Sequence, residues 1–132
     1  MTEEHASYVR WDPPDTVFVA IIGDISPAES DRLTGEIRRL ALDKPRAFLL
    51  SDVRRVGEVG TETRNRWIDA MKSVDICGTA IFGASFYIRV IATLGHKIGK
   101  VLHGRDNNPY FFCDTEAQAR AWIEERRATT PI

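Results

Sequence analysis

Three polar side chains stand at the ends of apolar runs, where ligands often bind in an open parallel sheet. Asp24 follows the run 16–23, and Ser51 with Asp52 closes the run that begins at residue 46. Two carboxylates and a hydroxyl are oxygen ligands that Mg²⁺ accepts, as at a site that takes up a phosphoryl group. Such residues also serve as caps and turn formers. Better cap candidates follow both aspartates, so capping alone does not explain them.

Catalytic chemistry finds little further support in the sequence. No base, nucleophile and orienting partner come together at a spacing that supports a reaction. His96 and His103 lack a carboxylate or cysteine at ligand spacing, so they are typical of a solvated basic face rather than a zinc site. We predict a protein that is not an enzyme, with no catalytic residue, no metal and no cofactor.

The stretch from Cys77 to His103 lies in the most basic part of the chain. No acidic residue occurs between Asp75 and Asp106, and four basic residues give this segment a local charge of +4: Arg89, Lys97, Lys100 and Arg105. Its first part, 79–82, has the pattern of a buried strand, and its second part has the periodicity of an amphipathic helix.

Ser85 is the residue that opens this basic helix, directly after Gly83 and Ala84. Free backbone N–H groups, the helix dipole and Arg89 one turn on would favour a bound anion there. Ser85 is equally suited to cap the helix, and no phosphate-loop spacing is present. We favour capping.

Overall composition narrows the class of protein. A chain of 132 residues forms one domain, and a net charge of -1 argues against general attraction to nucleic acid or acidic membranes. No apolar run reaches the roughly 18 residues of a membrane-spanning helix, and the first residues lack a secretion signal. We therefore expect a soluble cytoplasmic protein. Cys77 and Cys113 are expected to remain free thiols.

The elements that position these residues alternate regularly. Apolar runs predict strands at 5–11, 16–23, 46–51, 79–82 and 109–113, and helices begin near Ser26, Thr61, Ser85 and Thr115. Residues 53–60, with two glycines, are expected to form a loop, and residues 104–108 a turn. The order β-β-α-β-α-β-α-β-α predicts one α/β domain over 1–132, with its ordered core at about 5–127. Its mixed sheet is mainly parallel, with one antiparallel N-terminal strand.

Two short motifs in this order resemble the STAS domain, and more closely its divergent SpoIIAA-like, or STAS/SEC14-like, relatives. Residues 23–26, Gly-Asp-Ile-Ser, look like the family's G-x-L-D. Residues 50–53, Leu-Ser-Asp-Val, followed by Val56 and Val59, look like its L-D-L-S-G-V-x-x-I run. The resemblance covers about residues 5–127 and implies the SpoIIAA-like fold.

The resemblance also implies a place for a phosphorylation switch. Bacterial anti-sigma-factor antagonists of the family end this run in D-S-S-G, whose second serine is phosphorylated, and Gly60-Thr61-Glu62-Thr63 occupies that place here. Glu62 aligns with the phosphoacceptor. Thr61 or Thr63 could substitute, or Glu62 could act as a permanent negative charge. We favour a third reading, in which Thr61 caps the helix and the switch is lost.

Our leading hypothesis is a non-enzymatic regulatory domain that presents the start of the second helix and the basic helix to a protein partner. The alternative is SEC14-like binding of a small anionic amphiphile, such as a fatty acid or phospholipid. Arg89 or Lys97 would then hold the headgroup, and the side formed by Ala92, Gly95 and Gly99 would lie against the tail. An exposed apolar face on the third helix would indicate a homodimer.

Overall fold

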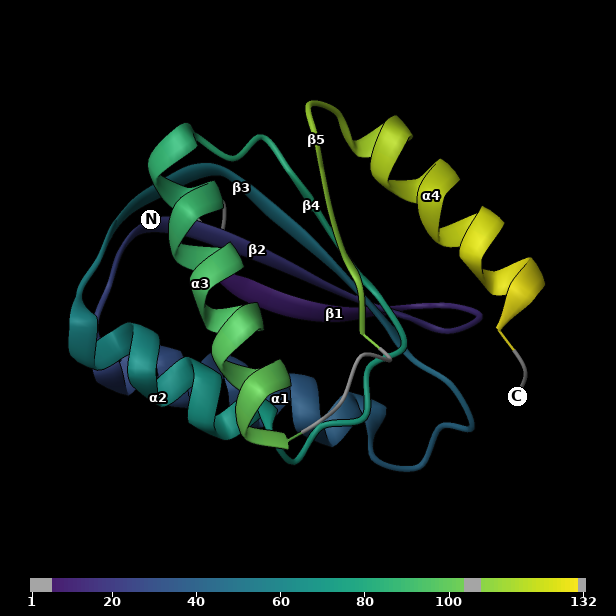
Figure 1. Ribbon diagram of the computed structural model, residues 1–132, viewed down its shortest axis with the longest axis horizontal. Helices are drawn as coiled ribbons and strands as arrows, with labels where there is room; N and C mark the ends of the chain where they lie inside the picture. Colours follow the sequence, from purple (N-terminus) through teal and green to yellow (C-terminus); the bar gives the residue numbers. More distant parts are fainter. Residues whose placement is uncertain (1–5, 104–107, 131–132) are drawn as a thin grey trace.

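The computed structural model describes residues 6–103 and 108–130, and for residues 95–103 it describes the backbone only. Nine elements follow one another in the predicted order (Figure 1). They are β1 (Tyr8–Asp12), β2 (Thr16–Ile25), α1 (Pro27–Ala41), β3 (Phe48–Val59), α2 (Thr61–Met71), β4 (Thr79–Phe82), α3 (Phe86–His103), β5 (Tyr110–Cys113) and α4 (Glu116–Thr129). The expected turn at 104–108 lies almost wholly outside the described residues.

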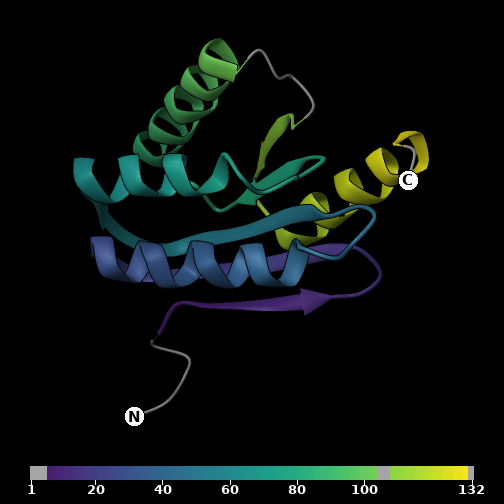
Figure 2. The ribbon, with the colours of Figure 1, turned by 90° about the horizontal axis from the view of Figure 1, so that it is seen from below.

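The five strands form one mixed sheet in the order β1-β2-β3-β4-β5. β1 is antiparallel to β2 at one edge, and the other neighbours are parallel. This arrangement confirms the predicted fold class. Both crossover helices after β2 and β3, together with α3, pack on one face, whereas α4 covers the other face (Figures 1 and 2).

Two apolar layers hold the helices to the sheet. Residues of opposite parity along β2 serve the two faces, as expected for a strand buried on both sides. Val17 and Val19 pack with Leu33 and Ile37 of α1, whereas Phe18 packs on the α4 side, where Ala119 and Ile123 lie. Alternate residues of β2 therefore hold α1 on one face of the sheet and α4 on the other.

The predicted caps at Ser26 and Thr115 are confirmed, whereas the predicted cap at Thr61 is wrong. The Ser26 hydroxyl accepts a hydrogen bond from the Glu29 N–H, and Thr115 forms a reciprocal capping box with Gln118. At α2 the N-cap is Gly60, so Thr61 is the first helical residue and its side chain caps nothing. The last residue with extended backbone before a helix is the cap, and here that residue is the glycine.

The expected loop at 53–60 is wrong, because β3 continues to Val59. β2 also continues, to Ile25, and the two strands stay paired through two register shifts. Asp24 connects the carboxyl ends of β2 and β3, because its carboxylate accepts a hydrogen bond of 2.7 Å from the Glu58 N–H. A Cβ at Gly57 would clash with that carboxylate. Gly57 therefore allows close strand packing rather than a loop.

No helix in the described part of the chain is long and apolar enough to cross a membrane. Cys77 and Cys113 are free thiols, as expected.

Candidate functional site

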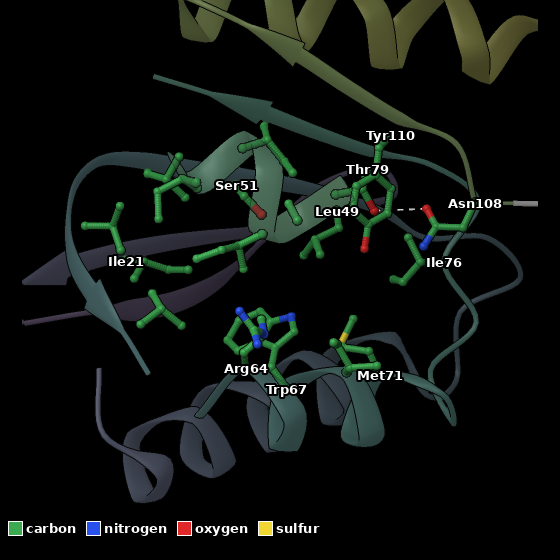
Figure 3. Close-up of a pocket in the computed structure, with 18 of the residues that line it drawn as sticks. Ile21, Leu49, Ser51, Arg64, Trp67, Met71, Ile76, Thr79, Asn108 and Tyr110 are labelled. Carbon is green, nitrogen blue, oxygen red and sulfur yellow. Dashed lines mark hydrogen bonds between the residues drawn. The ribbon is translucent and has the colours of Figure 1, made fainter. Parts of the chain in front are cut away.

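A cavity of about 330 Å³ lies between the sheet and helices α2 and α3 (Figure 3). Its floor is the face of β2, β3 and β4 that carries Ile21, Ser51 and Ile81. Trp67 of α2 forms one wall, and α3 contributes Ile88 and Ala92. The volume is at the lower end of the roughly 300–1,000 Å³ typical of ligand pockets. The cavity is large enough for a small organic molecule.

Strand periodicity explains the composition of the floor. Leu49, Ser51 and Val53 alternate along β3, so all three face α2 and α3. Within this row of aliphatic side chains Ser51 is small, and so is Ala92 on α3. Small side chains on facing elements leave space that larger ones would fill. The floor and the α3 side of the cavity are therefore mostly apolar, with few polar groups.

One polar group of the cavity lies at the start of β4 and β5. The Thr79 hydroxyl donates a hydrogen bond of 2.9 Å to the side-chain oxygen of Asn108, and Tyr110 lies beside them (Figure 3). Burial raises the pKa of the Tyr110 hydroxyl, which keeps this group neutral at physiological pH. These residues give one end of the cavity neutral hydrogen-bonding character.

Comparison with solved structures assigns the fold. The chain is similar to an uncharacterized protein of the DUF3478 family from Shewanella loihica PV-4, which is described as having a SpoIIAA-like fold. The TM-score is 0.64, and the match covers 89% of this chain and 92% of that chain. The chain has a SpoIIAA-like fold. Sequence identity is 10%, so the likeness shows the fold alone. No family model matches the chain, and no curated protein does.

Within this SpoIIAA-like fold, Asp24 and Asp52 do not come together. Asp52 lies beside Ala20 of β2, and Asp24 is four residues further along β2, which corresponds to about 13 Å. Asp24 binds the Glu58 N–H, and Asp52 forms hydrogen bonds of 3.0 and 2.8 Å with the Arg54 guanidinium. This separation argues against a shared cation site for the two carboxylates. Within residues 6–103 and 108–130, no cluster of metal-ligating side chains occurs.

Arg54 determines the charge state of Asp52. Burial raises the pKa of this carboxyl, but the hydrogen bonds and charge of Arg54 outweigh burial and hold the pKa below its ordinary value. Asp52 is therefore ionised at neutral pH and engaged with a neighbouring side chain.

The start of α2 presents the residues aligned with the phosphorylation switch. Thr61 and Glu62 are exposed, and Glu62 forms a surface ion pair of 3.5 Å with Arg66. Thr63 is buried, and its hydroxyl donates a hydrogen bond of 3.1 Å to the carbonyl of Ile25. A kinase would find the Thr61 hydroxyl accessible and the Thr63 hydroxyl inaccessible. Thr63 instead connects α2 to the end of β2.

Ser85 and Arg89 have structural partners at the start of α3. The Ser85 hydroxyl accepts a hydrogen bond of 3.2 Å from the Ile88 N–H, so this residue caps the helix. Arg89 forms an ion pair of 3.6 Å with Asp114 and lies over the Phe112 ring. It is therefore engaged on the β5 side of α3. The side chains of Lys97 and Lys100 lie outside what the structure describes, and so do the surroundings of Gly95 and Gly99.

An apolar surface remains on the outer side of α3. Tyr87, Val90 and Leu94 are exposed there, as is Phe86, whose exposed fraction is 83%. The expectation of a protein partner or a homodimer stays a prediction.

Sequence reasoning missed the residues that form the cavity. It placed Ser51 at a strand end, because β3 was expected to stop there, whereas Ser51 lies inside the strand. A hydroxyl between Leu50 and Val53 in a buried run was the available signal. Arg64 and Trp67 of α2 gave no separate signal, because Trp67 reads equally well as a core residue.

Proposed function

We propose that this protein binds a small apolar or amphipathic molecule in the cavity between the sheet, α2 and α3. The observation that carries the proposal is a cavity of about 330 Å³ lined largely by aliphatic side chains and Trp67. Ligand-binding sites are typically concave and lined mainly by apolar and aromatic side chains with a few polar groups, as this cavity is. Apolar surface around such a space favours a ligand that displaces its water.

The position of the cavity supports the amphiphile hypothesis in a modified form. An apolar ligand was expected under the third helix, and Ile88 and Ala92 of α3 do line the cavity. The expected headgroup contact at Arg89 loses support, because Arg89 faces Asp114 and Phe112 instead. The side chain of Lys97, the other expected headgroup contact, lies outside the described residues, so the proposal rests on the apolar lining.

Titration with the neutral fluorescent probe N-phenyl-1-naphthylamine tests the proposal. We expect saturable binding of one probe per chain, with higher probe fluorescence in the apolar cavity. Ala92→Phe places a ring in the cavity, so the affinity should fall at least tenfold, which is about 1.4 kcal/mol. Ala121→Phe makes the same change at an exposed position of α4 and should leave the affinity unchanged.

Equal probe affinity in the wild type and Ala92→Phe would contradict the proposal, as would the absence of saturable binding to the wild type. Circular dichroism of both variants should show the wild-type spectrum, which separates a filled cavity from a misfolded protein.

A further inference from the structure

Arg64 is a half-buried arginine that lines the cavity, and its side chain has no interaction partner among the described residues. Its side chain extends from α2 toward the space below the sheet (Figure 3). Among the described residues, its guanidinium forms no hydrogen bond, ion pair or contact with an aromatic ring. A guanidinium offers five donors, and because no buried side-chain nitrogen of the described residues lacks a partner, those of Arg64 are open to the cavity.

The other described arginines make this exception informative. Most of them bind a carboxylate, as Arg66 on the same helix binds Asp31, or a backbone carbonyl, as Arg126 binds that of Cys77. Two others within the described ranges, Arg38 and Arg55, also form no hydrogen bond, ion pair or ring contact, and both are exposed to water. Arg64 alone among these combines partial burial with no partner. Its donors are therefore available to a ligand in the cavity.

Ser51 provides a second, independent polar group without a partner. Its exposed fraction is 6%, and its hydroxyl forms no hydrogen bond within the described part of the chain. It lies on the sheet side of the cavity, whereas Arg64 comes from α2 on the opposite side (Figure 3). No buried side-chain nitrogen or oxygen of the described residues lacks a hydrogen-bond partner, so the Ser51 oxygen is open to the cavity and can bond to a molecule that enters it. Two such groups on opposite walls point to one ligand.

We propose that the natural ligand carries a carboxylate that Arg64 binds, with its apolar body against the aliphatic lining. This inference rests on the proposed function. A carboxylate suits the planar guanidinium, because two parallel N–H···O bonds can form between them. Ser51 offers one further hydrogen bond, and Tyr110 and Thr79 are neutral. The exposed lining residues Lys72 and Asp75 carry one charge of each sign, so together they add no net charge to the cavity.

The cavity volume indicates what size of ligand the site can hold. Since one water molecule occupies roughly 30 Å³ in the liquid, a cavity of about 330 Å³ has room for at least roughly ten non-hydrogen atoms. A carboxylic acid with a chain of about eight carbons has this size. A medium-chain carboxylate therefore fits the cavity.

Calorimetric titration of octanoate and 1-octanol at pH 7 separates the headgroup from the chain. We expect the wild type to bind octanoate at least tenfold more tightly than 1-octanol. Arg64→Gln should abolish that preference and leave the affinity for 1-octanol unchanged. Arg64→Lys, which keeps the charge but not the paired donors, should restore part of the preference. Arg66→Gln removes the same charge from an exposed position of α2 and should behave as the wild type.

The outcomes distinguish the two proposals. If the wild type binds 1-octanol as tightly as octanoate, or if Arg64→Gln keeps the preference, the carboxylate inference is overturned while the cavity still binds apolar molecules. If both compounds and the neutral naphthylamine probe fail to bind, the proposed function itself is overturned, and the inference with it.

Discussion

The Asp15 side chain links segments that are far apart in the sequence. Its exposed fraction is 5%, and its carboxylate accepts hydrogen bonds of 2.9 and 2.7 Å from Arg127 of α4 and of 3.1 Å from Arg46. Arg46 also donates to the carbonyls of Arg127 and Thr130. The network joins the start of β2 and the segment before β3 to the end of α4.

Removal of the Asp15 charge should destabilise the fold. Asp15→Asn leaves two guanidinium groups without their shared anion, so we predict a loss of about 3 kcal/mol in the free energy of unfolding, measured in urea. Asp43→Asn removes a carboxylate whose side chain is 81% exposed and paired with Lys44, and should cost less than about 0.5 kcal/mol. Similar losses in both variants would contradict the account of the network.

The same network predicts a pH dependence. Burial raises the pKa of Asp15, but the hydrogen bonds and charges of Arg127 and Arg46 outweigh it and hold the pKa below 3.8. The folded state therefore binds this proton less readily than the unfolded state. The stability from Asp15 is present above about pH 4 and is lost as the pH falls through its folded pKa. Asp15→Asn should show a smaller decrease in stability between pH 5 and pH 3.

At the scale of elements, the extension of β3 determines where the site residues lie. A strand that ended at Ser51 would place Ser51 and Asp52 at the sheet edge, as the sequence suggested. Pairing of β2 and β3 up to Val59 instead places Ser51 inside the sheet. Glycine at position 57 permits this pairing, because a Cβ there would lie 2.9 Å from the backbone nitrogen of Asp24.

Two glycine variants test this role of Gly57. Gly57→Ala forces Asp24 away from the Glu58 N–H and should lower the free energy of unfolding by roughly 1–3 kcal/mol. Gly35→Ala, in α1, meets no atom within 4 Å and should raise it by up to about 1 kcal/mol. Urea unfolding of both variants measures the difference. A neutral Gly57→Ala would mean that the close approach of the strands is not required.

For the whole molecule, sequence patterns predicted the order of elements, the parallel sheet and its antiparallel edge, because these follow from local periodicity and connection rules. The caps at Ser26 and Thr115 are equally local. The cavity was not predictable in this way. It arises where Ser51, Trp67 and Ala92 meet from three separate elements, and the free volume between them depends on tertiary packing.

The central claim is that the cavity binds an apolar molecule, and isoleucine methyl spectra test it most directly. Spectra of isoleucine-labelled protein would be recorded with and without saturating N-phenyl-1-naphthylamine. We predict that the methyl signals of Ile21, Ile81 and Ile88, which line the cavity, shift under the ring current of the probe. Ile123 of α4, which is buried against the opposite face of the sheet, should not shift. Unchanged cavity signals, or shifts centred on Ile123, would contradict the claim.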